Sequence, residues 1–412
     1  MKKIMLIALA AVLVVAFCAP AMAATKKVSF YGDIRFNTYW VKKDSDYFNN
    51  YQKMADKSDN DLMWQADFGD SRFGARFMEG PISANVEIRP TGPSTTGYRQ
   101  WWGQWDFGPG AILVGHTYTP ACVTISNSQF DSETGVLYGS FMSRLRTTQI
   151  RLTVPFSMGK LVIGLLNNPA VAPDVVDSAK IAATGSEPKA SDYTDYDTYK
   201  DEHDDYNELV AQYDFSHPRK YDTDVKIPEI ETCLTLKFSP VQVDLVGAYS
   251  RFKYEEVISS ASETVTSYFY GARLIVPFGP FSFKALYIGG QNLGNYEDLS
   301  TGTLNYTKMR WDVSTDKSED SDYSDYGATL GFKANDMVSL EAGYFYQKTE
   351  RYQKEEDPNA HYYLMAAITP VKGFTIYPEI GVRDEKDSTD ASGTTTDEGK
   401  RTYFGAYWKI SF

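Results

Sequence analysis

The amino-acid sequence predicts an all-β fold: a transmembrane antiparallel β-barrel of sixteen strands with short periplasmic turns and long extracellular loops. Three observations lead to this prediction. The chain begins with a secretory signal pattern, and apolar and polar residues alternate along much of the remainder. It is also rich in aromatic residues, with 30 Tyr, 23 Phe and 7 Trp among 412 residues. Because lipid-facing and lumen-facing side chains alternate in such barrels, a polar average composition hides an apolar face.

Residues 1–23 have the pattern of a cleaved signal peptide. Two lysines follow Met1, an apolar run extends over residues 4–17, and a small-residue cleavage pattern ends at Ala23. The apolar run is too short for an ordinary membrane-spanning helix. We therefore expect residues 24–412 to be exported and to form the barrel in the outer membrane of a Gram-negative cell.

The clearest alternation lies at the two ends of the mature chain. From Val28 to Trp40 the apolar and polar residues occupy opposite parities, and the same holds from Tyr403 to Phe412. A period of two is the pattern of a strand with one apolar face and one wet face. A β-bulge is expected near residues 69–71, because the apolar parity is even before this point and odd after it.

Seven tight turns separate alternating segments and therefore indicate hairpins. They are Glu79-Gly80-Pro81, Gly108-Pro109-Gly110, Ser157-Met158-Gly159, Ser239-Pro240, Gly279-Pro280, Ala334-Asn335-Asp336 and Pro370-Val371-Lys372-Gly373. Seven tight turns with both chain ends on the same side give sixteen strands. Longer polar connections are expected on the other side, at about 42–60, 90–98, 119–140, 167–225, 254–266, 290–322, 350–360 and 384–399. This asymmetry is typical of bacterial outer-membrane barrels.

Charge and composition exclude several other classes of protein. The chain has 54 acidic and 41 basic residues, a net charge of −13, and removal of two signal-peptide lysines would make it −15. This sign disfavours nucleic-acid binding. Outside the signal, Cys122 and Cys233 are too few for a disulfide-rich scaffold or a multi-cysteine metal site, and spacing does not tell whether they pair. The four histidines are scattered, only His116 and His361 fall in expected strands, and no HExxH or GxSxG motif supports catalysis.

Three stretches resemble the sixteen-stranded trimeric porins of Gram-negative outer membranes: Val28 to Arg35, Ser71 to Phe77, and Tyr407 to Phe412. The resemblance covers essentially the whole mature chain. It implies a homotrimeric, water-filled channel for passive diffusion of small hydrophilic solutes and ions, in contact with outer-membrane lipid and lipopolysaccharide. It also implies that Phe412 is the tag read by the barrel-assembly machinery. No metal, nucleotide or redox cofactor is expected.

In the porins that this chain resembles, the third long loop folds into the barrel and its acidic residues face arginines on the wall. The corresponding loop here is 119–140, which implies a pore constriction containing Asp131 and Glu133. The expected wall arginines are those on the wet faces of strands: Arg35, Arg72, Arg76, Arg89 and Arg151. Opposed rows of charge would set a transverse field across a narrow aqueous opening. A wet-facing arginine that merely solvates the lumen is the alternative for each position.

Several functional alternatives stay open at this stage. The channel could be selective for a particular anion or sugar, or the barrel could be a plugged structural or adhesion protein. Wall arginines favour anions, whereas the acid-rich stretches 191–205 and 319–325 would gather cations at the mouth. Because these effects oppose each other, the sequence does not determine the sign of selectivity. The acidic stretches could also bind divalent cations through oxygen ligands, or simply form a solvated surface.

Overall fold

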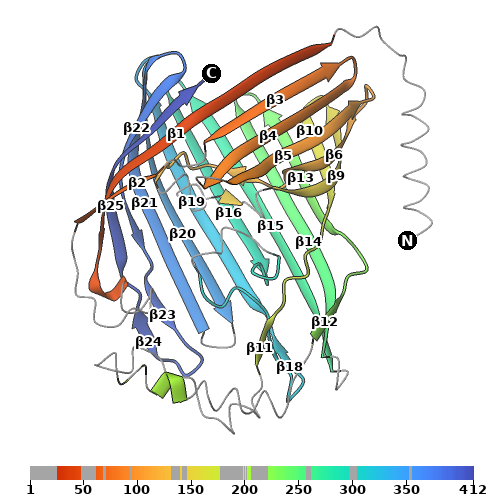
Figure 1. Ribbon diagram of the computed structural model, residues 1–412, viewed down its shortest axis with the longest axis vertical. Coiled ribbons are helices and arrows are strands. Elements are labelled where there is room, and N and C mark those ends of the chain that lie inside the picture. The colour runs from red at the N-terminus through yellow and green to blue at the C-terminus, as the bar shows by residue number, and fades with distance from the viewer. Residues whose placement is uncertain are drawn as a thin grey trace.

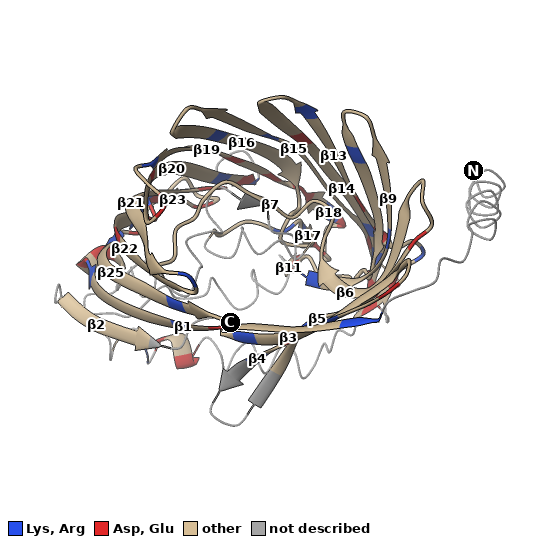
Figure 2. Cartoon of the chain, turned by 90° about the horizontal axis from the view of Figure 1, so that it is seen from above, with Lys and Arg blue, Asp and Glu red and all other residues tan. Residues whose placement is uncertain are grey.

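The computed structural model describes residues 26–47, 62–67, 71–92, 95–130, 140–141, 146–176, 198, 200, 202–205, 221–256, 261–296, 304–351 and 355–412. Within these ranges the chain forms a barrel of long, tilted antiparallel strands (Figure 1). Viewed from above, the strands close into a ring (Figure 2). The expected signal peptide at 1–23 lies outside the described residues.

The closed barrel has sixteen strand positions, which confirms the predicted fold class and strand number. The second position is shared by two consecutive segments, β2 (Leu62–Asp67) and β3 (Arg72–Glu79). The other positions are β1 (Lys27–Lys43), β4 (Ile82–Gly92), β5 (Thr95–Asp106), β6 (Ala111–Tyr118), β9 (Arg146–Phe156), β10 (Gly159–Leu166), β13 (Glu229–Phe238), β14 (Val241–Glu256), β15 (Ser262–Phe278), β16 (Phe281–Gln291), β19 (Ser321–Lys333), β20 (Val338–Arg351), β21 (Glu355–Val371), β22 (Phe374–Asp384) and β25 (Lys400–Ser411).

The barrel closes by pairing its first strand with its last. β1 and β25 are antiparallel neighbours, with Asp33 opposite Ser411 at one end of the ladder. Gly32 and Phe412 extend this ladder by exchanging two backbone hydrogen bonds of 3.0 Å. Closure leaves no open sheet edge, and an open edge could not be satisfied in hydrocarbon.

The predicted β-bulge lies in the second strand position. Asn37 of β1 pairs with Asp67, and Asp33 pairs with Arg72, so four steps along β1 face five steps along its partner. The partner therefore contains one extra residue, which confirms the bulge. Next to it, the hydroxyl of Ser71 accepts a hydrogen bond of 2.9 Å from the backbone N–H group of Arg35. The extra residue restores the outward direction of the apolar face.

All seven predicted tight turns join strands that pair as hairpins. They lie at 80–81, 107–110, 157–158, 239–240, 279–280, 334–337 and 372–373. Gly80 and Gly279 have φ angles of 56° and 60°, which a residue without a Cβ adopts at little cost. The turns gather at one end of the barrel, away from the long connections (Figure 1).

The outer face of the barrel carries large apolar side chains, and polar residues lie inside. Phe30 is 70% exposed and Trp101 is 57% exposed, whereas Asn85 and Glu231 are buried. This arrangement inverts the pattern of a water-soluble protein and suits a barrel surrounded by lipid. Separately, the described residues contain no helix that is long and apolar enough to cross a membrane.

The long connections carry short strands of their own: β7 (Val123–Thr124), β8 (Ser140–Phe141), β11 (Asp174–Val176), β12 (Tyr221–Asp224), β17 (Arg310–Asp312), β18 (Lys317–Glu319), β23 (Asp387–Thr389) and β24 (Thr395–Asp397). β11, β17 and β18 form a separate sheet that joins two of these connections. Trp311 of β17 is fully buried in an apolar cluster together with Phe252 and Val265 of the barrel. The loop end of the barrel is thus partly covered by packed structure.

Candidate functional site: the pore lining

The described part of the third long connection, residues 119–130, lies inside the barrel, and we call it the inner loop. β7 of this loop is seen within the ring of strands (Figure 2). Its first residues contact β10 and β13. A Cβ at Gly164 would lie 2.7 Å from the ring of Pro120, and the backbone N–H group of Ala121 donates to Glu231 at 2.9 Å. The absence of a side chain at Gly164 therefore allows the loop to approach the wall.

The far end of the inner loop is bound by a buried carboxylate of β22. Glu379 accepts hydrogen bonds from the hydroxyl of Ser128 at 2.5 Å and from the backbone N–H group of Gln129 at 2.7 Å. It also accepts one from the hydroxyl of Tyr403 at 2.7 Å. A buried carboxylate is costly unless its oxygens are hydrogen-bonded, so these donors stabilise both the wall and the loop.

The middle of the inner loop is held by a second buried carboxylate and a wall cation. Glu341 of β20 accepts hydrogen bonds from the backbone and side-chain amides of Asn127, at 2.8 and 2.5 Å, and from the Tyr363 hydroxyl at 2.5 Å. The ammonium group of Lys284 lies 3.1 Å from the same carboxylate and donates to the carbonyl of Ile125 at 3.0 Å. The loop backbone is thus fixed by opposite charges on β16 and β20, the two strands that flank β19.

An aromatic contact ends the described part of the inner loop. Phe130 stacks on Tyr403 of β25 with ring centroids 3.6 Å apart, and it meets Tyr39 of β1 edge to face at 5.1 Å. The guanidinium of Arg383 lies 4.9 Å from the centre of the Phe130 ring. Such contacts add to the gain from burying the ring. From Pro120 to Phe130 the loop therefore follows the inner surface from β10 round to β25.

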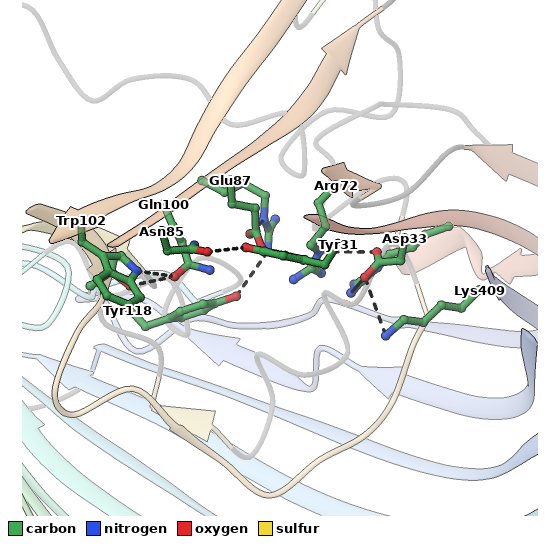
Figure 3. A network of polar contacts seen from close by, with 12 residues as sticks. Tyr31, Asp33, Arg72, Asn85, Glu87, Gln100, Trp102, Tyr118 and Lys409 are labelled. Carbon is green, nitrogen blue, oxygen red and sulfur yellow. Dashed lines mark hydrogen bonds and ion pairs between the residues drawn. The ribbon is translucent and has the colours of Figure 1, made fainter. Parts of the chain in front are cut away.

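A network of charged side chains occupies the wall where β1 meets its neighbours (Figure 3). Asp33 of β1 forms an ion pair and a 3.1 Å hydrogen bond with Arg35. Arg72 of β3 and Lys409 of β25 approach the same carboxylate at 3.5 and 4.0 Å. One carboxylate therefore faces three cations.

The network continues across β4, β5 and β6 (Figure 3). Glu87 accepts a 2.8 Å hydrogen bond from Nε of Arg99, and both side chains are almost fully buried. The hydroxyl of Tyr31 lies 3.0 Å from both Glu87 and Asn85, and Arg99 also donates to the hydroxyl of Tyr118 at 3.3 Å.

These side chains give one part of the lumen wall an excess of positive charge. The cations and carboxylates of the network form a set that we call the basic wall: Arg35, Arg72, Arg99 and Lys409 with Asp33 and Glu87. Among the described residues, these four cations and two carboxylates leave an excess of two positive charges. In water-filled pores, rings or rows of such groups set ion preference.

Three of the five predicted wall arginines come from β1 and β3. Arg35 and Arg72 meet at Asp33 and belong to the basic wall. Arg76 lies over the ring of Tyr31, with 5.2 Å between its guanidinium carbon and the ring centre. The bulge places Arg72 and Arg76 on the inner parity, while their neighbours such as Phe73 face outward. Their part in a constriction stays a prediction.

The other predicted constriction residues are more dispersed. Arg151 of β9 stands apart from the basic wall and donates to the carbonyl of Tyr118 at 3.3 Å. Arg89 lies half-buried near the loop end of β4. Asp131 and Glu133 fall outside the described residues. For these four positions, too, a role in the constriction stays a prediction.

Arg99 was not among the predicted site residues, and a second β-bulge accounts for this. In the ladder between β4 and β5, Glu87 pairs with Gln100 and Ile88 pairs with Tyr98, so Arg99 is the extra residue. Tyr98 faces outward with 71% exposure, while Arg99 is buried beside Glu87. Strict alternation cannot place two consecutive residues on one face. The only signal in the sequence was an arginine at the edge of an expected loop.

Neither histidines nor acidic clusters form a recognisable catalytic or metal centre among the described residues. His361 of β21 is buried and lies 2.9 Å from the hydroxyl of Tyr403, and His116 lies on β6, as expected. No group of three or more His, Cys, Asp or Glu side chains in this part of the chain could hold a metal ion. Cys122 and Cys233 are both free thiols.

A family model described as Gram-negative porin matches residues 8–352. The chain belongs to the Gram-negative porin family. This porin is a channel of the Gram-negative outer membrane that allows passive diffusion, and it is not an enzyme. The porin assignment confirms the resemblance found in the sequence, and it sets aside the plugged and enzymatic alternatives.

Solved structures show the same fold at low sequence identity. The outer-membrane channel DcaP of Acinetobacter baumannii has a TM-score of 0.62 at 13% identity, covering 94% of this porin and 97% of that chain. The trimer form of OmpT of Vibrio cholerae has a TM-score of 0.56 at 13% identity over 94% and 100% of the two chains. An anion-selective porin from Comamonas acidovorans has a TM-score of 0.53 at 13% identity over 94% and 100%. Comparison with curated proteins found no match.

Proposed function

We propose that the basic wall and the inner loop form the charged constriction of this porin, and that the constriction favours anions over cations of similar size. The excess of two positive charges that the described residues give to the basic wall is the observation that carries this proposal. The acids behind the inner loop lie on other strands and are not part of the basic wall. Glu231, Glu341 and Glu379 are at most 6% exposed, and their oxygens accept hydrogen bonds from the loop.

The expected size of the effect follows from Coulomb's law. A unit charge about 5 Å from a permeating ion contributes roughly 0.8 kcal/mol in water, which is about a fourfold change in local concentration. Salt screens part of this, because the Debye length is about 10 Å at 0.1 M. Removing one cation of the basic wall should therefore change the permeability ratio about twofold to fourfold.

Arg72→Gln is the sharpest variant, because Arg35 still pairs with Asp33 when Arg72 is lost. Lys333→Gln is the matched control: it removes a charge beside a tight turn, where Lys333 pairs with Asp336 at 2.7 Å. Reversal potentials under a salt gradient in planar bilayers should give an anion preference for the wild type. Arg72→Gln should reduce it about twofold to fourfold, and the control should leave it unchanged. A cation preference in the wild type would refute the proposal.

We also propose a homotrimer. The trimer form of OmpT shares the fold of this porin, and the outer face of this porin presents an aromatic cluster for contact with another subunit or with lipid. In that cluster Trp40 lies 4.5 Å from Trp64 and 5.3 Å from Phe404, between ring centroids. Detergent-solubilised porin should have three times the chain mass in light scattering. A single-chain mass, in preparations that form channels, would contradict the trimer.

We further propose that the apolar outer face contacts lipid and lipopolysaccharide, and that the barrel-assembly machinery reads Phe412. The Phe412 side chain is 66% exposed, although its backbone is paired with Gly32. Phe412→Ala should lower the yield of folded barrel in cells while leaving the heat stability of the folded fraction nearly unchanged. An unchanged yield would exclude this role for Phe412.

A further inference from the structure

A cavity of about 350 Å³ lies between the first residues of the inner loop and the wall formed by β9, β10 and β13 to β15. We call it the basic cavity, after the charged side chains that line it: Arg151, Lys160, Lys237, Arg273 and Asp244. Four cations and one carboxylate give this lining a net charge of +3. Lys160 and Lys237 lie next to the tight turns 157–158 and 239–240, so the lining of the cavity extends to the turn end of the barrel.

The one carboxylate of the basic cavity is already neutralised. Nε and Nη2 of Arg273 lie 3.0 and 2.9 Å from Asp244. Asp244 also accepts hydrogen bonds from the hydroxyl of Thr235 at 2.6 Å and the amide of Gln242 at 2.9 Å. Nη1 of Arg273 donates a hydrogen bond to the carbonyl of Thr124 in the inner loop, at 2.9 Å. These two residues are a structural pair, and among the described residues the other three cations of the lining have no carboxylate partner.

The remaining cations have hydrogen-bonding capacity that the described residues do not use. Nη1 of Arg151 donates to the carbonyl of Tyr118, but its Nε is buried and has no partner in the described part of the barrel. Within the same residues, neither Lys160 nor Lys237 has an ion pair, and both are exposed to the lumen. A guanidinium and two ammonium groups around a small cavity match the charge and acceptor pattern of an oxyanion.

We propose that the basic cavity is a binding subsite for the oxyanion group, carboxylate or phosphate, of a small solute that permeates this porin. The inference rests on the channel function and deepens the proposed anion preference, but it uses residues outside the basic wall. Arg151 supplies directed hydrogen bonds, and Lys160 and Lys237 supply charge from the neighbouring strands. A weak subsite of this kind concentrates anionic solutes beside the constriction and still releases them.

The cavity contains a natural chemical reporter. Cys122 lines it from the inner loop and is a half-buried free thiol, whereas Cys233 lines it from β13 and is buried. The Cys122 thiolate attacks a methanethiosulfonate reagent, forming a mixed disulfide and releasing a sulfinate. A positive cavity attracts an anionic reagent of this class and repels a cationic one, so the ratio of the two modification rates measures the local potential.

The experiment compares these rates in the intact porin carrying Cys233→Ser, so that only Cys122 reacts. The anionic reagent should react at least about fivefold faster than the cationic one, and inorganic phosphate should slow the reaction of Cys122 with either reagent. The double variant Lys160→Gln/Lys237→Gln should bring the rate ratio close to one and abolish protection by phosphate. Lys333→Gln, the control outside the cavity, should change neither result.

Arg151→Lys tests whether the directed hydrogen bonds of Arg151 contribute to oxyanion binding beyond its positive charge. It keeps the positive charge but loses the forked donors, so the rate ratio should stay high while protection by phosphate weakens at least about fivefold. Protection by succinate but not by phosphate would assign the site to carboxylates, and the reverse would assign it to phosphates. Lack of protection by both ions would overturn the subsite.

The proposed subsite and the proposed constriction can be refuted independently of each other. If Arg72→Gln leaves the reversal potential unchanged while phosphate still protects Cys122, the proposed constriction is wrong and the subsite stands. If the wild type is anion-selective but the double lysine variant has the wild-type rate ratio, the subsite is overturned. Variants that fail to fold are recognised by loss of the heat-modifiable band in detergent electrophoresis, and Arg151→Lys, which retains the charge, then supplies the deciding measurement.

Discussion

Replacing Glu341 by Gln should detach the inner loop from the wall without unfolding the barrel. The carboxylate accepts four hydrogen bonds, from two amides of Asn127, the hydroxyl of Tyr363 and the ammonium of Lys284. The amide of a glutamine can accept from some of these donors. Its NH₂ group cannot accept from any, and it carries no charge to balance Lys284.

The magnitude follows from counting the bonds that are lost. Hydrogen bonds to a charged group contribute about 1.5–3 kcal/mol each, and at least two of the four are lost in Glu341→Gln. Part of this is offset, because a neutral amide is cheaper to bury than a carboxylate. A net loss of about 3 kcal/mol in loop docking corresponds to roughly a 100-fold larger population of detached loop.

Hydrogen exchange followed by mass spectrometry measures this population directly. Amides of the inner loop, including those of Asn127 and Gln129, should exchange roughly 100-fold faster in Glu341→Gln, while strand amides keep their protection. Glu87→Gln is the matched control, because Glu87 is also a buried carboxylate of the lumen but pairs with Arg99 rather than with the loop. Single-channel recordings of Glu341→Gln should show larger current fluctuations.

Two results would refute the reasoning. If loop exchange in Glu341→Gln matches that of the wild type, the carboxylate does not hold the loop. If Glu87→Gln accelerates loop exchange as strongly, the effect reports a general loosening of the barrel rather than the contact with Asn127.

Three further predictions concern the loop and the extracellular side. Phe130→Ala removes the ring that stacks on Tyr403 with centroids 3.6 Å apart. The free energy that holds the inner loop against the wall should fall by about 3–5 kcal/mol, and the noise of the single-channel current should rise. Current noise equal to that of the wild type would contradict this prediction. Arg351→Gln breaks the 2.5 Å ion pair with Asp174 and should expose β11 to proteases, whereas unchanged cleavage would count against it. Burial, followed by nearby carboxylates, raises the pKa of Tyr306 to about 12. The stability that this raised pKa contributes is therefore present below pH 10 and lost as pH rises toward 12, and Tyr306→Phe should remove a tyrosinate absorbance step near pH 12.

Much of the fold could be predicted because the barrel is built from local patterns. Alternation identifies strands, since successive side chains point to opposite faces, and proline and glycine mark the tight turns. The bulge near residue 70 could also be predicted from the sequence, because one extra residue reverses the parity of a long apolar pattern. The second bulge at Arg99 was not, because it begins beside an expected loop where there is no pattern to reverse.

The pore lining could be predicted only in part. Arg35 and Arg72 were found because they lie on the wet parity of clear strands, and Asp33 lies on the same face two residues from Arg35. The contact that fixes the middle of the inner loop joins Asn127 to Glu341, 214 residues apart. Nothing local in the sequence distinguishes that glutamate from others on the wet face.

The sequence by itself determined the class of fold, the number of strands and the family, because each depends on short-range periodicity and turn chemistry. The tertiary structure alone decided which polar side chains meet. Closing the sheet and folding residues 119–130 inward brought β10, β13, β20, β22 and β25 against one loop. It also left Arg151, Lys160 and Lys237 around one cavity. Register and curvature set these encounters, and both arise from all sixteen strands together.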